Sequence, residues 1–138
     1  MKYFITLLLL SLTINCFSQN KFDRKIKITL PDSVGIYEKA RQALISNEFV
    51  VKDNHNKDTL TTYVRECSKL GYAFVRAELV NNTIILSGAY GEKKLNYFGY
   101  TITPKGYQDI IYYKGSQSWK LLVKIAEDLH GEISYLKQ

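Results

Sequence analysis

The side chains that could support metal or nucleophilic chemistry are few in this chain, which has two histidines and two cysteines. Asp53, His55 and Asp58 fall close together in one polar stretch. Their spacing matches neither a calcium loop nor a helical pair of histidines, and the stretch lacks the glycine that a calcium loop requires. We therefore interpret it as a solvated turn and predict no bound metal.

A catalytic nucleophile or a phosphate-binding loop is not indicated either. Cys67 is interpreted as a small buried apolar residue, because a reactive thiolate needs a nearby base. His130 falls in the last turn of a predicted helix, where a protonated imidazole favours the helix dipole. Residues 88–91, Gly-Ala-Tyr-Gly, lack the helix start that would present N–H groups to a phosphate. These patterns indicate a non-enzymatic domain without a cofactor.

Residues 73–90 form the clearest structural signal, because two runs of alternating apolar residues are joined by Asn81-Asn82. Asparagine tolerates the positive φ that a two-residue hairpin turn demands. Pairing Val80 with Thr83 then sets the register, since directly opposed residues lie on the same face of a sheet. The first face of this predicted hairpin is wholly apolar and carries Leu79 opposite Ile84, Ala77 opposite Leu86, and Val75 opposite Gly88.

The second face of the hairpin mixes apolar and charged side chains. Its candidate interaction residues are Phe74, Arg76, Glu78, Val80 and Ile85. Apolar surface that no other element covers is a usual mark of an interface. We therefore predict that this face binds a partner, either another envelope protein or a second copy of the chain. Cover by the N-terminal segment is the alternative.

Tyrosines suggest a second hypothesis. A groove lined by Tyr97, Tyr100, Tyr112 and Tyr113 could carry a carbohydrate or a peptide, because aromatic rings offer rigid stacking surfaces. Packing in the core is the alternative use for at least half of these rings. Aromatic residues occur at both parities in this region, so alternation does not indicate which face is buried.

The other elements must position these faces. Strand patterns occur at residues 25–30, 49–53, 59–65, 95–103 and 110–114, and amphipathic helix patterns at 34–47 and 119–130. Two helices with one apolar face each, and a sheet with one apolar face, predict an α+β fold. We expect a two-layer sandwich, with an antiparallel meander sheet and both helices packed on one face. Trp119 is the expected occupant of the space beside Gly88.

The helix ends also carry signals. The candidate N-terminal caps are Asp32 or Ser33 for the first helix and Ser116 or Ser118 for the second. Gly35 weakens the first turn, so the first helix is expected to begin a residue or two late. Gly131 is the predicted stop of the second helix, and residues 133–136 are expected to add a short tail contact.

The chain begins with the features of a secretion signal. Lys2 supplies the charge, residues 4–14 are almost continuously apolar, and residues 16–18, Cys-Phe-Ser, suit a signal peptidase. We predict a signal peptide at 1–18 and a single α+β domain at 19–138, exported to the periplasm or secreted. The apolar run is shorter than the about 20 residues that span a bilayer, so no transmembrane span is expected. A lipid anchor at Cys16 is the competing interpretation.

Cleavage before Gln19 would leave Cys67 as the only cysteine, so the domain would be held by its core without an intramolecular disulfide. The loss of Lys2 lowers the formal net charge from +6 to +5. Basic residues are scattered, and residues 21–27 form the only dense basic run. For an exported protein, this run is expected to flank an edge strand rather than to bind nucleic acid.

The order of these motifs resembles that of a known group of domains. A predicted helix begins with residues 37–40, Tyr-Glu-Lys-Ala, and is followed by residues 48–51, Glu-Phe-Val-Val. The last predicted helix begins with residues 118–120, Ser-Trp-Lys. Over nearly all of the predicted mature chain, this looks like small secreted bacterial domains with a TBP-like fold. The resemblance implies an α+β fold and an envelope setting, and it transfers no site residues.

Taken with the absence of a catalytic motif, the sequence predicts an exported, non-enzymatic binding or interaction domain of the bacterial cell envelope. One alternative is a small ligand, carbohydrate or peptide carrier that uses the tyrosine-lined groove. A small enzyme is the other.

Overall fold

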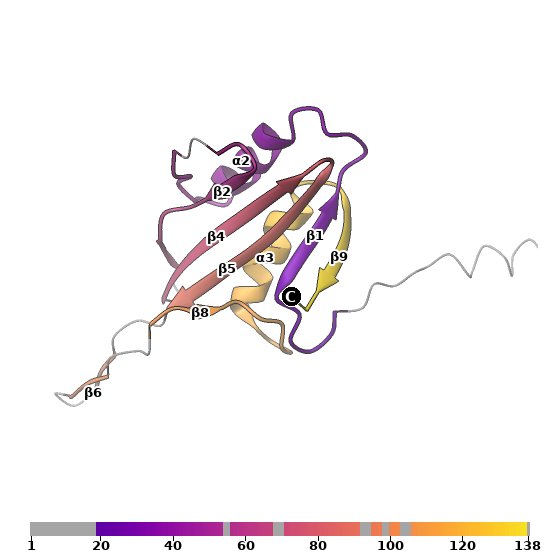
Figure 1. Ribbon diagram of the computed structural model, residues 1–138. Coiled ribbons are helices and arrows are strands. Elements are labelled where there is room, and N and C mark those ends of the chain that lie inside the picture. The colour runs from indigo at the N-terminus through magenta and orange to yellow at the C-terminus, as the bar shows by residue number, and fades with distance from the viewer. Residues whose placement is uncertain are drawn as a thin grey trace, which may run out of the picture.

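The computed structural model describes residues 19–53, 56–67, 71–91, 95–97, 100–102 and 106–137, with only the backbone described at 95–97 and 100–102. In chain order (Figure 1), the elements are β1 Lys25–Thr29, α2 Ile36–Ser46, β2 Thr59–Thr61, β3 Arg65–Cys67, β4 Gly71–Val80, β5 Thr83–Gly91, β6 Leu95–Tyr97, β7 Tyr100–Ile102, β8 Gln108–Asp109, α3 Gln117–Glu127 and β9 Glu132–Leu136.

The β4–β5 hairpin is the centre of the main sheet and has the predicted register. Val80 lies opposite Thr83 and Val75 lies opposite Gly88. Asn81, the first residue of the connecting turn, has a φ of 55°, which is the left-handed conformation that the Asn-Asn pair indicated. The predicted apolar face is buried along the whole hairpin.

The first strand of the chain is inserted beside this hairpin. Within the described residues, the seven-stranded antiparallel sheet has the order β2-β4-β5-β1-β9, while β3 also pairs with β4 and β8 with β5. Ile26 lies opposite Leu86 and Ile28 opposite Ile84, so the alternating pattern of β1 extends the apolar face of β5. Chain neighbours alone did not indicate this position for β1.

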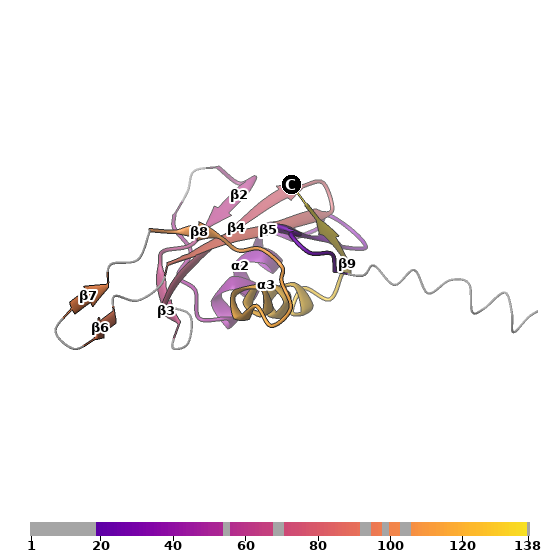
Figure 2. The same ribbon diagram turned by 90° about the horizontal axis from the view of Figure 1, so that it is seen from below.

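Both helices cover that apolar face, as Figure 2 shows, and the predicted two-layer α+β fold is confirmed. The core combines Ile26 and Ile28 of β1, Leu44 of α2, and Leu122 and Ile125 of α3, all fully buried. Packing both helices on one side buries their apolar stripes, and among the described residues no helix lies on the other side of the sheet.

The start of each helix shows which cap the chain uses. Helix α2 begins at Ile36, and its N-cap residue is Gly35, which has a φ of 65°. Glycine has no side chain to accept a capping hydrogen bond. The late start was predicted, but the prediction of a cap at Asp32 or Ser33 was wrong, because the Asp32 carboxylate accepts from the N–H of Val34 ahead of the helix. Helix α3 is capped as expected by Ser116.

Ser116 Oγ accepts a hydrogen bond of 3.2 Å from the backbone N–H of Trp119. Trp119 itself is 2% exposed and packs against two rings, those of Tyr112 and Tyr135, at centroid distances of 5.8 and 6.0 Å. It does not fill the space beside Gly88, as the sequence had suggested. A Cβ added at Gly88 would lie 3.0 Å from Ile110 Cδ1 and 3.6 Å from Leu122 Cδ2, so these side chains occupy the space.

The end of α3 also differs from expectation. The helix ends at Glu127, and the left-handed residue after it is His130, with a φ of 52°. Gly131 therefore does not act as the predicted helix stop. It lies where the chain passes β1, and a Cβ there would be 2.6 Å from Ile28 Cγ2. The glycine is required by the close approach of two segments rather than by the helix end.

Several short strands were assigned only roughly by their patterns. The predicted strand at 95–103 contains two, β6 and β7, which form a separate two-stranded sheet away from the main one (Figures 1 and 2). Residues 110–114 were expected to form a strand, whereas β8 covers Gln108–Asp109. Residues 132–136, expected as a tail contact, form the edge strand β9. The segments predicted as strands at 49–53 and 59–65 are joined by a bridge between Val51 and Thr62, whereas β2 pairs with β4.

Candidate functional site

The side of the sheet opposite the helices is called here the open face. It comprises alternate residues of the three central strands: Phe74, Arg76, Glu78 and Val80 of β4, Thr83, Ile85, Ser87 and Ala89 of β5, and Lys25, Lys27 and Thr29 of β1. All five residues of the candidate interaction face lie on it. Arg76 and Val80 are exposed, while Phe74, Glu78 and Ile85 are half-buried.

The register of the three strands sets up a row of charge across the open face. Arg76 lies opposite Ser87. Lys25 precedes Ile26, the partner of Leu86, so it lies beside Ser87 on the other side. One step along the strands, Ile85 has Glu78 on one side and Lys27 on the other. At Ile85 and Ser87 the central strand β5 is thus flanked by longer charged side chains, and we call the row of outward residues of β5 from Thr83 to Ala89 the trough.

At Ser87 to Ala89, the trough borders a groove of about 880 Å³. Its floor includes the small residues Ser87, Gly88 and Ala89, and its walls include the rings of Phe22 and Phe74. Basic side chains predominate around it, namely Lys21, Arg24, Lys25, Arg76 and Lys137, against two carboxylates, Glu78 and Asp109. The groove is therefore a concave, positively charged surface with an apolar component.

The two carboxylates of the groove are already paired with arginines. Asp109 Oδ2 lies 3.4 Å from Arg24 Nη1, and Glu78 Oε1 lies 3.7 Å from Arg76 Nε. These side chains are between 33% and 70% exposed, so each pair contributes little to stability. Within the part of the chain that the structure describes, the lysines of the groove have no salt-bridge partner. The groove therefore has an excess of positive charge that can attract an anion.

A turn at residues 20–23 forms one rim of this groove. The N–H of Asn20 donates to the carboxylate of Asp23 at 2.7 Å, and the backbone of Tyr112 bonds both Phe22 and Asp23. Asp23 is 1% exposed, so a buried residue attaches the turn to the domain. Phe22 has a φ of 76° and is 55% exposed. Lys21 Nζ lies 5.0 Å from the centroid of its ring.

The left-handed conformation of Phe22 is unfavourable for a bulky residue, by roughly 1–2 kcal/mol. The anchoring bonds of the turn hold it there. Residues that are held in strained backbone conformations cluster at active sites and ligand-binding sites. Sequence reasoning assigned no binding role to Phe22, because residues 21–27 were interpreted as the flank of an edge strand. That interpretation was wrong, since β1 lies between β5 and β9.

The tyrosines of the second hypothesis are divided between two places. Tyr97 and Tyr100 face each other in the β6–β7 sheet, and their side chains lie outside the described residues. Tyr112 is half-buried against Trp119, and Tyr113 is 46% exposed. Both line a hollow of about 440 Å³ beside α3. The structure thus brings two of the four tyrosines together, away from the open face.

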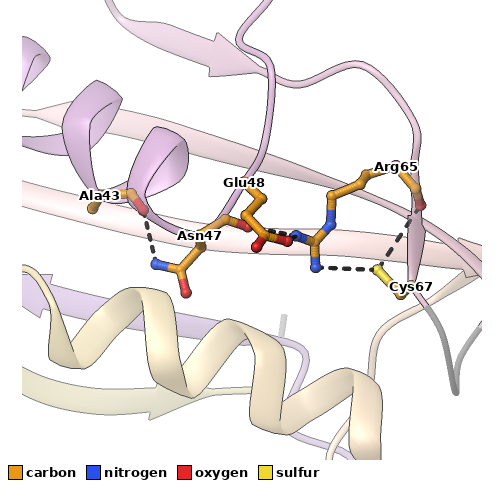
Figure 3. A network of polar contacts seen from close by, with 5 residues as sticks. All are labelled: Ala43, Asn47, Glu48, Arg65 and Cys67. Atoms are coloured by element: carbon orange, nitrogen blue, oxygen red, sulfur yellow. Dashed lines mark hydrogen bonds and ion pairs between the residues drawn. The ribbon is translucent and has the colours of Figure 1, made fainter.

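The buried cysteine belongs to a polar network at the end of α2, drawn in Figure 3. Arg65 Nη1 donates to the carbonyl of Asn47 at 2.9 Å and to Glu48 Oε2 at 2.6 Å, while Nη2 lies 3.6 Å from Cys67 Sγ. The guanidinium also lies over the ring of Phe49, 4.8 Å from its centroid. Arg65 therefore joins the end of α2 to strand β3. Cys67 is 7% exposed, so its predicted burial is confirmed.

Glu48 occupies the position where a helix end usually has glycine. Its N–H bonds the carbonyl of Ile45 and the N–H of Phe49 bonds that of Leu44, which is a Schellman motif, and its φ is 65°. Replacing Glu48 by glycine is expected to raise the free energy of unfolding by about 0.5–1 kcal/mol, because strain is relieved and the lost ion pair is largely exposed.

Urea denaturation measures this change. Glu48→Ala is the matched control, because it removes the same ion pair and keeps the strain. If glycine proved no more stable than alanine, the ion pair with Arg65 and not the backbone would dominate at this position.

Of the two histidines of the chain, only His130 lies within the described residues. His55 lies outside the described residues, and His130 is exposed after α3. In the described ranges, no cluster of three or more His, Cys, Asp or Glu side chains could hold a metal ion. Within those ranges no helix is long and apolar enough to cross a bilayer. Comparison of the chain with protein-family models, curated proteins and solved structures finds no match.

Proposed function

We propose that this protein is a non-enzymatic binding domain that takes up an anionic partner on the open face of its sheet. The observation that carries the proposal is the groove, where three lysines without a carboxylate partner in the described structure surround an apolar floor. A concave site with an excess of positive charge suits recognition of an oppositely charged ligand.

The rest of the molecule supports this assignment. Val80 is 55% exposed and Phe22 is equally exposed, so the open face and its rim present apolar surface beside the charge. The formal net charge of +6 has the same sign as the groove and favours encounter with anions. The sequence signals of export, and the resemblance to small secreted domains, support a partner in the cell envelope.

The test is binding of three anionic probes to the purified protein: poly-L-glutamate, a linear polyuronate, and vesicles that contain an anionic phospholipid. Lys25→Glu with Lys137→Glu reverses charge at the groove, and Lys120→Glu with Lys124→Glu makes the same charge change on α3. We expect at least one probe to bind with an affinity that falls as salt rises. The groove variant should bind it at least tenfold more weakly, whereas the α3 variant should bind nearly normally.

Two results would contradict the proposal. One is that none of the three probes binds. The other is an equal loss of binding in the groove and α3 variants, because that would mean net charge alone accounts for binding.

A further inference from the structure

We infer that the anionic partner is an acidic peptide segment that lies extended along β5 in the trough, with an apolar side chain in the groove at its end. This inference rests on the proposed function and names the class of ligand. It follows from the shape of the trough, the spacing of its cations, and the carbon-rich surfaces beside them.

The shape of the trough suits an extended chain. From Thr83 to Ala89, the outward side chains of β5 are Thr, Ile, Ser and Ala, and charged side chains of β4 and β1 flank the middle two, Ile85 and Ser87. This stretch is about 20 Å long at about 3.4 Å per residue, so an extended peptide of about six to eight residues spans it. A compact ligand would use only the groove at one end.

The cations of the trough are separated rather than convergent. Arg76 and Lys25 lie on either side of β5, two strand spacings apart, which is about 10 Å. Lys27 follows Lys25 on the same side, two residues along the strand. Carboxylates at intervals along a chain can meet these charges one by one. A single phosphate or sulfate would reach only a part of them.

The apolar surface distinguishes a peptide from other polyanions. Phe22 and Phe74 flank the groove, Gly88 and Ala89 contribute to its floor, and Ser87 is its one lining side-chain hydroxyl among the described residues. A polyuronate could meet the charged lining side chains, but it has no apolar side chain to place between the two phenylalanine rings. A peptide can instead place an apolar side chain on this surface. A membrane surface suits the concave groove less well.

Phe22 is the residue expected to recognise that apolar side chain. The hydrogen bonds of the turn at 20–23 hold the backbone of Phe22 in a left-handed conformation at the rim of the groove. The backbone that presents the ring is therefore already ordered before a ligand binds. Phe22→Asn removes the ring with a residue that adopts this conformation more readily. The variant therefore separates recognition by the ring from the structure of the turn.

The experiment uses synthetic peptides of about eight residues, the length that spans the trough, and measures binding to the purified protein by fluorescence anisotropy. The test peptide alternates Glu with small residues and has one Phe. In the first comparison peptide Gly replaces the Phe, and in the second Gln replaces every Glu. We expect the test peptide to bind at least fivefold more tightly than the first and at least tenfold more tightly than the second.

Protein variants then locate the peptide. Phe22→Asn should abolish the preference for the peptide with Phe over the peptide with Gly, and should leave binding of the latter nearly unchanged. Asp109→Asn should strengthen binding of the test peptide two- to fivefold, because it removes a competing carboxylate and releases Arg24. A gain of affinity is not a result that structural damage would produce.

The outcomes separate this inference from the proposed function. If the polyuronate or the anionic vesicles bind at the groove and the test peptide does not, the groove binds anions but the inference of a peptide is wrong. The same conclusion follows if the peptide binds but neither the Phe preference nor the effect of Asp109→Asn is seen. If no anionic probe binds, the proposed function fails as well.

Discussion

Replacing Trp119 by alanine is expected to lower the free energy of unfolding by about 4 kcal/mol. Trp119 is the largest fully buried side chain of the described core. It belongs to α3 and packs against the rings of Tyr112 and Tyr135. Those neighbours come from a loop and from the edge strand β9, so the cavity would loosen three segments at once. Urea denaturation followed by circular dichroism measures the loss.

Trp119→Phe is the informative comparison. The indole Nε1 is buried and has no hydrogen-bond partner in the described structure, so removing it deletes an unsatisfied donor. The phenylalanine variant is therefore expected to lose only about 1–2 kcal/mol, mostly from reduced volume. An equal loss in the alanine and phenylalanine variants would show that the indole N–H makes a stabilising interaction.

Replacing Gly131 by alanine is expected to cost about 2 kcal/mol through overpacking. A Cβ at this position would lie 2.6 Å from Ile28 Cγ2 and 2.8 Å from the carbonyl oxygen of Thr29, and backbone cannot move aside as a flexible side chain can. The change would press the chain after α3 away from β1 and weaken the pairing of β9. The same denaturation measurement applies.

Gly115→Ala is the matched control for this effect. Gly115 has a φ of +87° and nothing within 4 Å of an added Cβ, so alanine there costs only the backbone strain, about 1 kcal/mol. A smaller loss at Gly131 than at Gly115 would mean that the segment after α3 yields easily. Conversely, a larger loss at Gly131 supports close packing against β1 as the reason for that glycine.

Local pattern was sufficient for the elements whose signals lie within a few residues. The register of the β4–β5 hairpin follows from a two-residue turn and one apolar face, and every predicted pair is present. The cap of α3 at Ser116 and its apolar face around Leu122 follow from helix spacing. Alternation failed for residues 95–103, because aromatic residues at both parities do not distinguish one strand from two.

The candidate site was predicted only in part. Phe74, Arg76 and Glu78 could be assigned to one face because they share a strand, and all three line the groove. The sequence did not indicate that Phe22 and Lys137 would join them from opposite ends of the domain. Long-range pairings of this kind leave no local pattern, since each partner has an ordinary sequence context.

The sequence by itself determined the two amphipathic helices, the central hairpin and the sides of its strands, because side-chain periodicity assigns residues to faces over short distances. Only the tertiary structure decided which strand lies next to β5. By placing β1 there, between β5 and β9, it brings Lys25 beside Ser87, and Phe22 and Lys137 into the lining of one groove. The physical reason is the burial of Ile26 and Ile28 in the common core, which positions the alternating residues Lys25 and Lys27 on the open face.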